Sequence, residues 1–294
     1  MSGLKPNLLV TGAGGQLGQE FVHMNHYGIE IIGKNRSELD ITDYDSCKTI
    51  CETLKPNFIV HAAAYTAVDQ AESDRNSAWA VNVEGTQNMA KAAEVVGAKF
   101  CYISTDYVFN GSGKEPYSES HPTDPQSVYG VTKLEGELKA LGFSSKCFIV
   151  RTSWVYGKYG RNFVQTMLQL AQSKKELKVV SDQIGSPTYT YDLAKFIIEL
   201  VQSEKYGIYH ASNTGSCSWY EFAKAIFEEA GVGPITVHPC STDQFPRPAP
   251  RPAYSVLGQQ ALIKAGFTPL RPWEEALRDY LSSLADSYIF PDNP

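Results

Sequence analysis

Tyr129 and Lys133 lie four positions apart and could together donate a proton to a carbonyl oxygen. On a helix, residues at this spacing share one face. A phenol titrates near ~10 and is a slow acid at neutral pH. A neighbouring ammonium stabilises the phenolate, so Lys133 is expected to lower the pKa of Tyr129, and it could also hold a nicotinamide ribose. Taken alone, the pair fits a half-buried tyrosine beside a surface lysine better, so its meaning depends on the surrounding sequence.

Thr105 offers a hydroxyl at the end of a predicted strand. The apolar run at 100–103 predicts the strand, and Ser104, Thr105 and Asp106 follow it. Ligands of open α/β sheets bind at the carboxyl ends of the strands. We therefore expect Thr105 to donate a hydrogen bond to a substrate oxygen. The alternative is that Thr105 only caps a turn, which is a common use of threonine.

A glycine-rich loop near the N-terminus predicts a dinucleotide site, because it follows a short apolar run and opens a helix. Gly12 allows a tight turn, Gly15 lets the backbone approach a pyrophosphate, and Gly18 lets the helix pack close to the sheet. Free N–H groups at the helix start would bind the anion. An ordinary strand–helix turn is the alternative. The predicted cofactor contacts in this loop are Gly12, Gly14, Gly15, Gln16, Leu17 and Gly18.

The segment after the second predicted strand is basic and bears on the choice of cofactor. Lys34, Asn35 and Arg36 stand where an acid would bind the ribose 2′-hydroxyl of NAD and a base would accept the 2′-phosphate of NADP. We therefore predict NADPH as the cofactor, in contact with Asn35 and Arg36, with use of NADH left open. A solvated loop with two exposed cations is the alternative. With the hydroxyl and the Tyr/Lys pair, this cradle implies hydride transfer at a carbonyl or carbinol carbon.

Two kinds of side chain in the second half of the chain could bind substrate. Trp154 could stack on the apolar face of a substrate, although a buried core tryptophan is the other interpretation. Arg247 and Arg251 could clamp a diphosphate, because guanidinium groups bind it through two parallel hydrogen bonds. Two arginines in a proline-rich surface loop are otherwise ordinary, so the clamp is one of two open alternatives.

Strand and helix patterns alternate through the first half of the chain. Continuous apolar strands between helices predict a parallel sheet that is covered on both faces. Right-handed crossovers then give a doubly wound, Rossmann-like α/β sheet. Strands are predicted at 7–11, 30–32, 58–64, 99–104 and 147–151, and helices at 16–24, 44–54, 75–96 and 128–141.

The pattern loosens after Arg151, where prolines and aromatic residues gather. Helices are predicted at 162–173, 191–202 and 219–230, with fewer strands. We expect a smaller, discontinuous α/β lobe that closes over the carboxyl edge of the sheet. The predicted division is a dinucleotide-binding domain at 1–151, to which segments near 180–205 return, and a mainly substrate-binding lobe at 152–294.

Composition and charge exclude several classes of protein. The 294 residues carry a formal net charge of −6 and no block of Lys or Arg, so we predict no nucleic-acid partner. No apolar stretch approaches the ~20 residues that a membrane helix needs, and residues 1–6 lack the apolar core of a signal peptide. The six cysteines form no CxxC pattern and are typical of buried thiols. We predict a cytoplasmic protein with no membrane partner.

Several segments, taken with these motifs, resemble the extended short-chain dehydrogenase/reductase family, and within it the reductases of dTDP-linked sugars. The likeness covers nearly the whole chain. The matching segments are TGAGGQLG at 11–18, HAAAYTAVDQAE at 61–72, STDYVF at 104–109, Tyr129-x-x-x-Lys133, RTSWVYG at 151–157 and DQIGSPT at 182–188.

The resemblance implies a reaction as well as a fold. It implies that Thr105, Tyr129 and Lys133 are catalytic, and that the C4 ketone of a dTDP-linked 4-keto-6-deoxyhexose is reduced to give dTDP-L-rhamnose. Tyr129 would protonate the nascent alkoxide. The further cofactor contacts expected are Asp40, Ile41, Ala62, Ala63, Ala64, Tyr129 and Lys133, and the expected substrate contacts are Val68, Asp69, Thr105, Asp106, Tyr129, Trp154, Asn162, Arg247 and Arg251.

The chain departs from the family pattern at two places. His61 stands where the pattern usually has Asn, and we expect it to change only the contacts of the loop above the nicotinamide. Some relatives bind a metal through acidic residues at a dimer contact, whereas the tail at 288–294 has no Glu. We therefore predict no metal, and either a monomer or a weak homodimer.

Two other functions remain as alternatives at this stage. A related sugar-nucleotide epimerase or dehydratase would recycle a tightly bound cofactor within each turnover. Dehydratases of the family have an acid after Thr-Asp, but Tyr107 stands there in this chain, and the basic turn at Arg36 suits an exchanging NADPH. The second alternative is a non-catalytic subunit that binds NADP and modulates a partner enzyme, which the intact Thr105, Tyr129 and Lys133 oppose.

Overall fold

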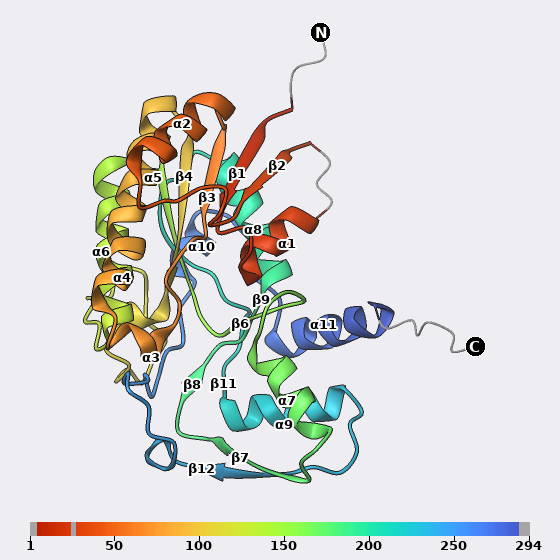
Figure 1. Ribbon diagram of the computed structural model, residues 1–294. Coiled ribbons are helices and arrows are strands. Elements are labelled where there is room, and N and C mark those ends of the chain that lie inside the picture. Colours follow the sequence, from red (N-terminus) through yellow and green to blue (C-terminus); the bar gives the residue numbers. More distant parts are fainter. Residues whose placement is uncertain (1–4, 25–27, 288–294) are drawn as a thin grey trace.

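The computed structural model describes residues 5–24 and 28–287 (Figure 1). The expectations that rest on residues 1–4 and on the tail at 288–294 therefore concern positions outside the described residues. Within the described ranges, no helix combines the length and the apolar content that crossing a bilayer requires.

Six parallel strands form the central sheet, in the order β10-β5-β4-β3-β1-β2. The interior stretches of these strands are apolar, as expected for strands that are covered on both faces, and buried polar residues such as His61 and Arg151 lie at or next to the carboxyl ends. The doubly wound α/β fold predicted from the sequence is confirmed. The strands are β1 (Asn7–Thr11), β2 (Glu30–Lys34), β3 (Phe58–His61), β4 (Lys99–Thr105), β5 (Cys147–Thr152) and β10 (Gly207–His210).

The strand order reverses at β1, which has β2 on one side and β3 on the other. A crevice opens at such a switch point, outside the carboxyl ends of the two neighbouring strands. Thr11 pairs with His61 there, so the glycine loop leaves the sheet beside the three alanines that follow β3. The prediction of a strand at 58–64 was too long, because β3 ends at His61 and the alanines cross the edge of the sheet.

Helices cover both faces of the sheet, and each face has its own apolar core (Figure 1). Helices α2, α5 and α6 cover one face, and α1, α8 and α10 cover the other. The helices of this part are α1 (Gln16–His23), α2 (Tyr44–Leu54), α3 (Val68–Ala71), α4 (Arg75–Trp79), α5 (Thr86–Val96), α6 (Val128–Phe143), α8 (Thr190–Gln202) and α10 (Gln260–Lys264).

Local sequence signals fix where these helices begin and end. The side chain of Asp43 caps α2 by accepting from the N–H of Asp45, and Lys55 ends that helix in a left-handed conformation before Pro56. Ser127 caps α6 by accepting from the N–H of Gly130 (3.1 Å). This cap sets the register of the helix that carries Tyr129 and Lys133.

The long helix predicted at 75–96 is helical throughout but changes type in the middle. A π-helical turn, Ala80–Gly85, lies between α4 and α5. Gly97, in a left-handed conformation, ends α5. Wider π turns often occur where a helix passes a functional site, and this one carries the buried Asn82 described below.

A smaller lobe packs below the carboxyl edge of the central sheet (Figure 1). In the described part of the chain, it has three two-stranded pairs and three helices around an apolar core that includes Tyr156, Phe222 and Tyr280. The strands pair as β6 (Val155–Tyr156) with β9 (Thr188–Tyr189), β7 (Glu176–Val180) with β12 (Thr236–Cys240), and β8 (Ile184–Gly185) with β11 (Cys217–Ser218). The helices are α7 (Phe163–Ala171), α9 (Trp219–Glu229) and α11 (Trp273–Ser287).

The chain passes from the central sheet to the smaller lobe and back. After β5 it builds β6, α7 and β7, and it then returns so that α8 packs on the same face as α1. The following strand, β10, pairs with β5 at the edge of the sheet. Helices α7, α8 and α9 lie where the sequence predicts helices, whereas α11 and β10 were not predicted.

Candidate active site

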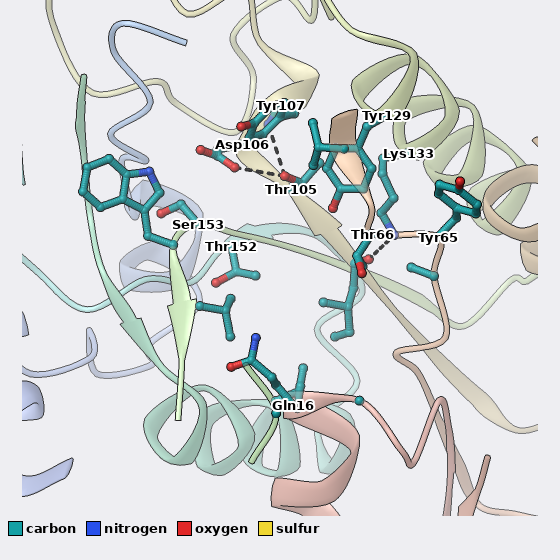
Figure 2. A pocket seen from close by; sticks show the side chains of 18 of the residues that line it. Gln16, Tyr65, Thr66, Thr105, Asp106, Tyr107, Tyr129, Lys133, Thr152 and Ser153 are labelled. Carbon is teal, nitrogen blue, oxygen red and sulfur yellow. Dashed lines mark hydrogen bonds between the residues drawn. The ribbon is translucent and has the colours of Figure 1, made fainter. Parts of the chain in front are cut away.

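A cavity of about 1130 Å³ opens at the carboxyl edge of the central sheet and reaches into the smaller lobe (Figure 2). It brings together residues that are far apart in the chain. Asn35 and Asn162 are the two predicted site residues that do not line it. The predicted residues that do are Gly12, Gly14, Gly15, Gln16, Leu17, Gly18, Arg36, Asp40, Ile41, Ala62, Ala63, Ala64, Val68, Asp69, Thr105, Asp106, Tyr129, Lys133, Trp154, Arg247 and Arg251.

The glycine loop is packed so closely that side chains are excluded at two positions. Gly12 has a φ of +69°, and a Cβ there would stand 2.6 Å from the backbone nitrogen of Ala63. A Cβ on Gly18 would stand 2.2 Å from the carbonyl oxygen of Gly12. Gly15 precedes α1 without a side-chain cap, so the first N–H groups of the helix are left for an anion. These features fit the pyrophosphate of a nicotinamide dinucleotide.

Gln16 and the residues after β2 supply polar groups around this cradle. The side-chain oxygen of Gln16 is buried and has no hydrogen-bond partner within the described residues. Arg36 lines the cavity, but the side chain of Asn35 instead accepts from the N–H (2.9 Å) and the hydroxyl (2.7 Å) of Ser37. Asp40 likewise accepts from Thr42, which lowers the pKa of the Asp40 carboxyl.

Thr105, Tyr129 and Lys133 meet where β4 ends beside the first turns of α6 (Figure 2). The Thr105 hydroxyl donates to Oδ1 of Asp106 (2.9 Å) and accepts from the N–H of Tyr107 (3.2 Å). The Tyr129 phenol points toward Thr105, which lies across the cavity from Gln16 in Figure 2. The three side chains therefore face one space together with the cofactor loop.

Burial governs the proton affinities of Tyr129 and Lys133. It raises the pKa of Tyr129 to about 12, against a smaller lowering by the Thr105 hydroxyl. It lowers the pKa of Lys133 to about 7, against the attraction of Glu137. The Tyr129 shift is opposite to the predicted one, because burial and not Lys133 sets its direction. A raised pKa keeps the phenol protonated, which is the state that a proton donor needs.

Lys133 is 2% exposed and is held by the sheet itself. Its Nζ donates to the carbonyl oxygen of Ile103 (2.6 Å) and lies 4.0 Å from the centroid of the Tyr102 ring. These contacts hold the Lys133 nitrogen at a fixed point near Tyr129 (Figure 2).

Asp106 is a buried carboxyl with an incomplete set of partners. It is 3% exposed, and its Oδ2 atom has no hydrogen-bond partner within the described residues. Burial raises the pKa of Asp106 to about 6, although the neighbouring hydroxyl groups of Ser255 and Thr105 act to lower it. A buried oxygen without a partner is costly unless it is protonated or meets a ligand, so Asp106 is poised for a group that enters the cavity.

His61 does not line the cavity and acts on it from beneath. Its Nδ1 contacts the hydroxyl of Thr11 (2.7 Å), which also accepts from the N–H of Ala63 (3.3 Å). Its Nε2 contacts the hydroxyl of Thr86 (3.3 Å), which donates to the carbonyl oxygen of Asn82 (2.7 Å). Burial lowers the pKa of His61 to about 3, so the ring is neutral. His61 therefore acts on the loop after β3 indirectly, through the hydroxyl of Thr11 that bonds Ala63.

Asn82, in the π-helical turn, extends this buried network to the helix of Tyr129. Its side chain accepts from the N–H of Tyr65 (2.8 Å) and donates to the hydroxyl of Thr132 (3.0 Å). Thr132 in turn donates to the carbonyl oxygen of Tyr129 (3.0 Å). The loop after β3 and the start of α6 are thus held by one set of hydrogen bonds.

A second buried polar cluster, called here the structural cluster, consists of Ser104, Glu137, Arg151 and His210. Glu137 receives two hydrogen bonds from Arg151 (2.8 and 2.7 Å) and one from Ser104 (2.5 Å). The Nδ1 of His210 lies 3.0 Å from the carbonyl oxygen of Gly258, and its Nε2 lies 3.4 Å from Arg151. Each member is at most 3% exposed. The cluster ties α6 to three different parts of the chain.

Aromatic side chains line the part of the cavity that belongs to the smaller lobe. Trp154 stacks on Trp219 with ring centroids 3.6 Å apart and an interplanar angle of 9°. Trp154 has a φ of +47°, which a non-glycine residue rarely adopts. Gly185 makes room for its ring, because a Cβ there would stand 2.5 Å from Trp154. The tryptophan is therefore held toward the cavity by the lobe's own packing.

Asp69 and Arg251 line the cavity but are already paired with each other. Arg251 donates to Oδ2 of Asp69 (2.8 Å), and the N–H of Ala249 donates to Oδ1 (3.2 Å). The pair fastens the proline-rich loop to the start of α3. Arg247 lies in the same loop, exposed and lining the cavity. The predicted diphosphate clamp stays a prediction for both arginines.

Asn162 serves the fold in the place where substrate binding is predicted. Its side chain caps α7 by accepting from the N–H of Gln165 (3.0 Å) and donates to the carbonyl oxygen of Gly157 (2.8 Å). Both of its polar atoms are thereby occupied, which explains why it does not line the cavity.

The sequence interpretation missed several residues that line the cavity. Thr152 ends β5 at the carboxyl edge and Ser153 follows it, so the rule that identified Thr105 applies to them as well. Trp219 and Phe163 come from separate helices, and no local pattern marks them. In the described part of the chain, no group of three or more His, Cys, Asp or Glu side chains is arranged to hold a metal ion.

Known proteins resemble this chain over nearly its whole length. The Spore coat polysaccharide biosynthesis protein SpsK of Bacillus subtilis (strain 168) is 48% identical over 275 residues, which cover 93% of this chain and 96% of that protein. The dTDP-4-dehydrorhamnose reductase of Aggregatibacter actinomycetemcomitans is 42% identical over 285 residues, which cover 92% and 97%. The crystal structure of dTDP-4-dehydrorhamnose reductase from Bacillus anthracis str. Ames in complex with NADP superposes with a TM-score of 0.93 at 45% identity, covering 95% of this chain and 100% of that one.

A family model agrees with these likenesses. The model of the RmlD substrate binding domain matches residues 6–286, which include both the glycine loop and the smaller lobe. The chain therefore belongs to the RmlD substrate binding domain family.

Proposed function

We propose that this protein uses NADPH to reduce the C4 ketone of dTDP-4-dehydro-6-deoxy-L-mannose (dTDP-4-dehydro-L-rhamnose). The product is dTDP-L-rhamnose, and the reaction is the last step of dTDP-rhamnose synthesis. The names of the relatives and the NADP complex of a similar structure support the substrate and the cofactor. The observation that carries the proposal is the meeting of Thr105, Tyr129 and Lys133 in the cavity that the glycine loop also lines.

When bound, NADPH supplies the hydride to the ketone carbon. Tyr129 donates its proton to the ketone oxygen, which becomes a hydroxyl. The raised pKa of Tyr129 keeps that proton in place until the oxygen gains charge, because an alkoxide is a much stronger base than a phenolate. A threonine hydroxyl rotates about its C–O bond, so Thr105 can release Asp106 and donate to the same oxygen. Lys133, fixed on Ile103, stabilises the phenolate that forms.

The rest of the cavity provides the substrate contacts in this proposal. Trp154 presents a rigid aromatic face to the deoxysugar, and Arg247 offers a guanidinium to the diphosphate. Residues 1–151, with the later return to the sheet, hold the cofactor, and residues 152–294 mainly hold the substrate. The cytoplasmic location and the monomeric or weakly dimeric state stay predictions.

The alternatives from the sequence have weaker support in the site. Tyr107, in place of the acid of a dehydratase, packs edge to face against Tyr129 with ring centroids 5.5 Å apart. A non-catalytic subunit would not need Thr105, Tyr129 and Lys133 to converge. Neither alternative explains the combination of an intact proton donor with a basic residue at position 36.

A substrate panel tests the proposal directly. Purified protein is mixed with NADPH and with dTDP-, UDP- or GDP-linked 4-ketosugars, and the absorbance of NADPH is followed. We expect one NADPH to be oxidised for each dTDP-linked ketosugar that is reduced. Conversion of the sugar without net oxidation would indicate an epimerase or dehydratase. Absence of any conversion until a partner enzyme is added would indicate a regulatory subunit.

A further inference from the structure

Apart from Lys133 of the candidate active site, four cations that line the cavity have no ion pair within the described residues. They are Arg36, Arg161, Lys178 and Arg247. The chain as a whole carries a net charge of −6, so unpaired cations gathered in one cavity indicate anionic ligands there. The proposed function brings two such ligands, the cofactor and the sugar nucleotide. Arg36 is predicted to bind the 2′-phosphate of NADPH and Arg247 to bind a diphosphate, whereas no ligand group has been assigned to Arg161.

Arg161 stands at the end of a loop that lies along the cofactor helix α1. The Tyr159 ring stacks on the His23 ring with centroids 4.7 Å apart. Gly160, with a φ of +70°, touches the first residue of α1, because a Cβ there would stand 2.7 Å from Cγ of Gln16. Two consecutive residues of the loop thus follow α1 toward its start, and Arg161 comes next.

The smaller lobe holds this loop from the other side. Asn162 donates to the carbonyl oxygen of Gly157 (2.8 Å) while it caps α7. The side-chain amide of Gln165 lies 3.4 Å from the carbonyl oxygen of Lys158. The backbone on both sides of Arg161 is therefore fixed, and its exposed side chain enters the cavity from a defined point.

The start of α1 lacks a basic side chain of its own. The segment from Gly12 to Gly18 contributes only backbone N–H groups and the amide of Gln16. A pyrophosphate carries two negative charges, and a guanidinium beside it forms charge-assisted hydrogen bonds. We propose that Arg161 binds the pyrophosphate of the nicotinamide cofactor, so that the smaller lobe supplies the cationic contact that the glycine loop lacks. This inference rests on the proposed function.

The positions of Lys178 and Arg247 indicate which cations face the cofactor pyrophosphate and which face the diphosphate of the sugar nucleotide. Lys178 lies in β7, which pairs with β12, and Arg247 follows β12 in the proline-rich loop. Neither residue belongs to the loop whose Tyr159 and Gly160 contact α1. Gly160 against Gln16 places Arg161 at the cofactor end of the cavity. The diphosphate of the sugar nucleotide is therefore left to Lys178 and Arg247.

Direct binding measurements test the role of Arg161. Dissociation constants of NADPH and NADH are measured by fluorescence titration, without sugar nucleotide, for the wild type and for Arg161→Ala. We expect both constants to rise by about 10- to 50-fold, since the two cofactors share the pyrophosphate and a charged hydrogen bond is lost. Arg161→Lys should lie between the two, because it keeps the charge and loses the fork. Lys174→Ala removes an exposed cation at the other end of α7 and should leave both constants unchanged.

The same variants distinguish the possible outcomes. Unchanged cofactor constants in Arg161→Ala would overturn the inference, and so would a loss of affinity for dTDP in place of the cofactors. A loss confined to NADPH would also overturn it, because the 2′-phosphate and not the pyrophosphate would then be the partner. A wild-type protein that binds neither cofactor would overturn the proposed function itself. Equal thermal melting of all variants is expected, since Arg161 is exposed.

Discussion

Two buried polar clusters lie one residue apart on β4 and one turn apart on α6. The structural cluster begins at Ser104 and Glu137, and the candidate active site begins at Thr105 and Lys133. These four side chains are all at most 5% exposed, so burial does not tell the clusters apart. What differs is the bonding.

Each charge of the structural cluster has a partner, since Glu137 and Arg151 pair through two hydrogen bonds. In the candidate active site, Asp106 keeps an oxygen without a partner, and burial moves the pKa values of Lys133 and Tyr129 far from their ordinary values. Complete bonding indicates a role in stability, and incomplete bonding indicates a role toward a ligand. This distinction can be tested on each side.

The largest effect is expected from Tyr129→Phe. Turnover of the ketosugar should fall by ~10²–10⁴-fold, because the variant lacks the general acid. The midpoint of thermal unfolding and the dissociation constant of NADPH should change little, since the ring remains. Steady-state oxidation of NADPH and a melting curve measure both. Near-normal turnover would show that Tyr129 is not the proton donor and would contradict the functional role assigned to its cluster.

Glu137→Gln should reverse this pattern. The change leaves Arg151 as a buried charge without its partner, so the free energy of unfolding should fall by ~3–5 kcal/mol in urea denaturation. Glu137→Gln combined with Arg151→Met should recover much of the loss, because no unpaired charge remains. If the single variant is as stable as the wild type, the cluster does not have the structural role assigned to it.

Asp106→Asn should stabilise the folded protein while it lowers activity. The folded-state pKa of about 6 lies above the ordinary 3.8, so the folded protein binds the proton more tightly, and stability falls as pH rises through this window. At pH 7.5 the charged carboxylate therefore costs up to ~3 kcal/mol. The variant should gain part of that in urea denaturation at pH 7.5, and the difference should disappear near pH 4. A variant that is less stable at pH 7.5 would show that Asp106 belongs with the structural residues.

The smallest effect is expected at an exposed cation, where solvent weakens the charge. Arg36→Ala should lower the preference for NADPH over NADH by about tenfold, through weaker binding of NADPH alone. The ratio of catalytic efficiencies with the two cofactors measures it. An unchanged ratio would show that Arg36 does not bind the 2′-phosphate of NADPH.

The first half of the fold was predictable because its signals are local. The apolar runs and the glycine loop each specify an element by themselves. The carboxyl-edge rule then brings Gly12, Thr105 and Tyr129 together without knowledge of distances. Asn35 and Asn162 do not line the cavity, for one shared reason. Short amide side chains bond readily to nearby backbone, and in this chain that use takes precedence over the cavity.

The smaller lobe could be predicted only in part. β6, β8, β9 and β11 have two residues each and are too short to show alternation. Trp154 and Trp219 meet through packing of separate elements, and the left-handed conformation of Trp154 has no sequence signal. Helix α11 is a different case, because Trp273, Ala276, Leu277 and Tyr280 are buried at helical spacing and the pattern was present.

The late arrival of β10 has a consequence for synthesis on the ribosome. β5 is buried along its whole length in the finished protein, yet its outer edge is covered by β10, which follows only after the first part of the smaller lobe and α8. At about 5–20 residues per second, a nascent chain would carry this apolar, unpaired edge for seconds. In the interval between the emergence of β5 and of β10, this strand edge is therefore open to pairing with other chains.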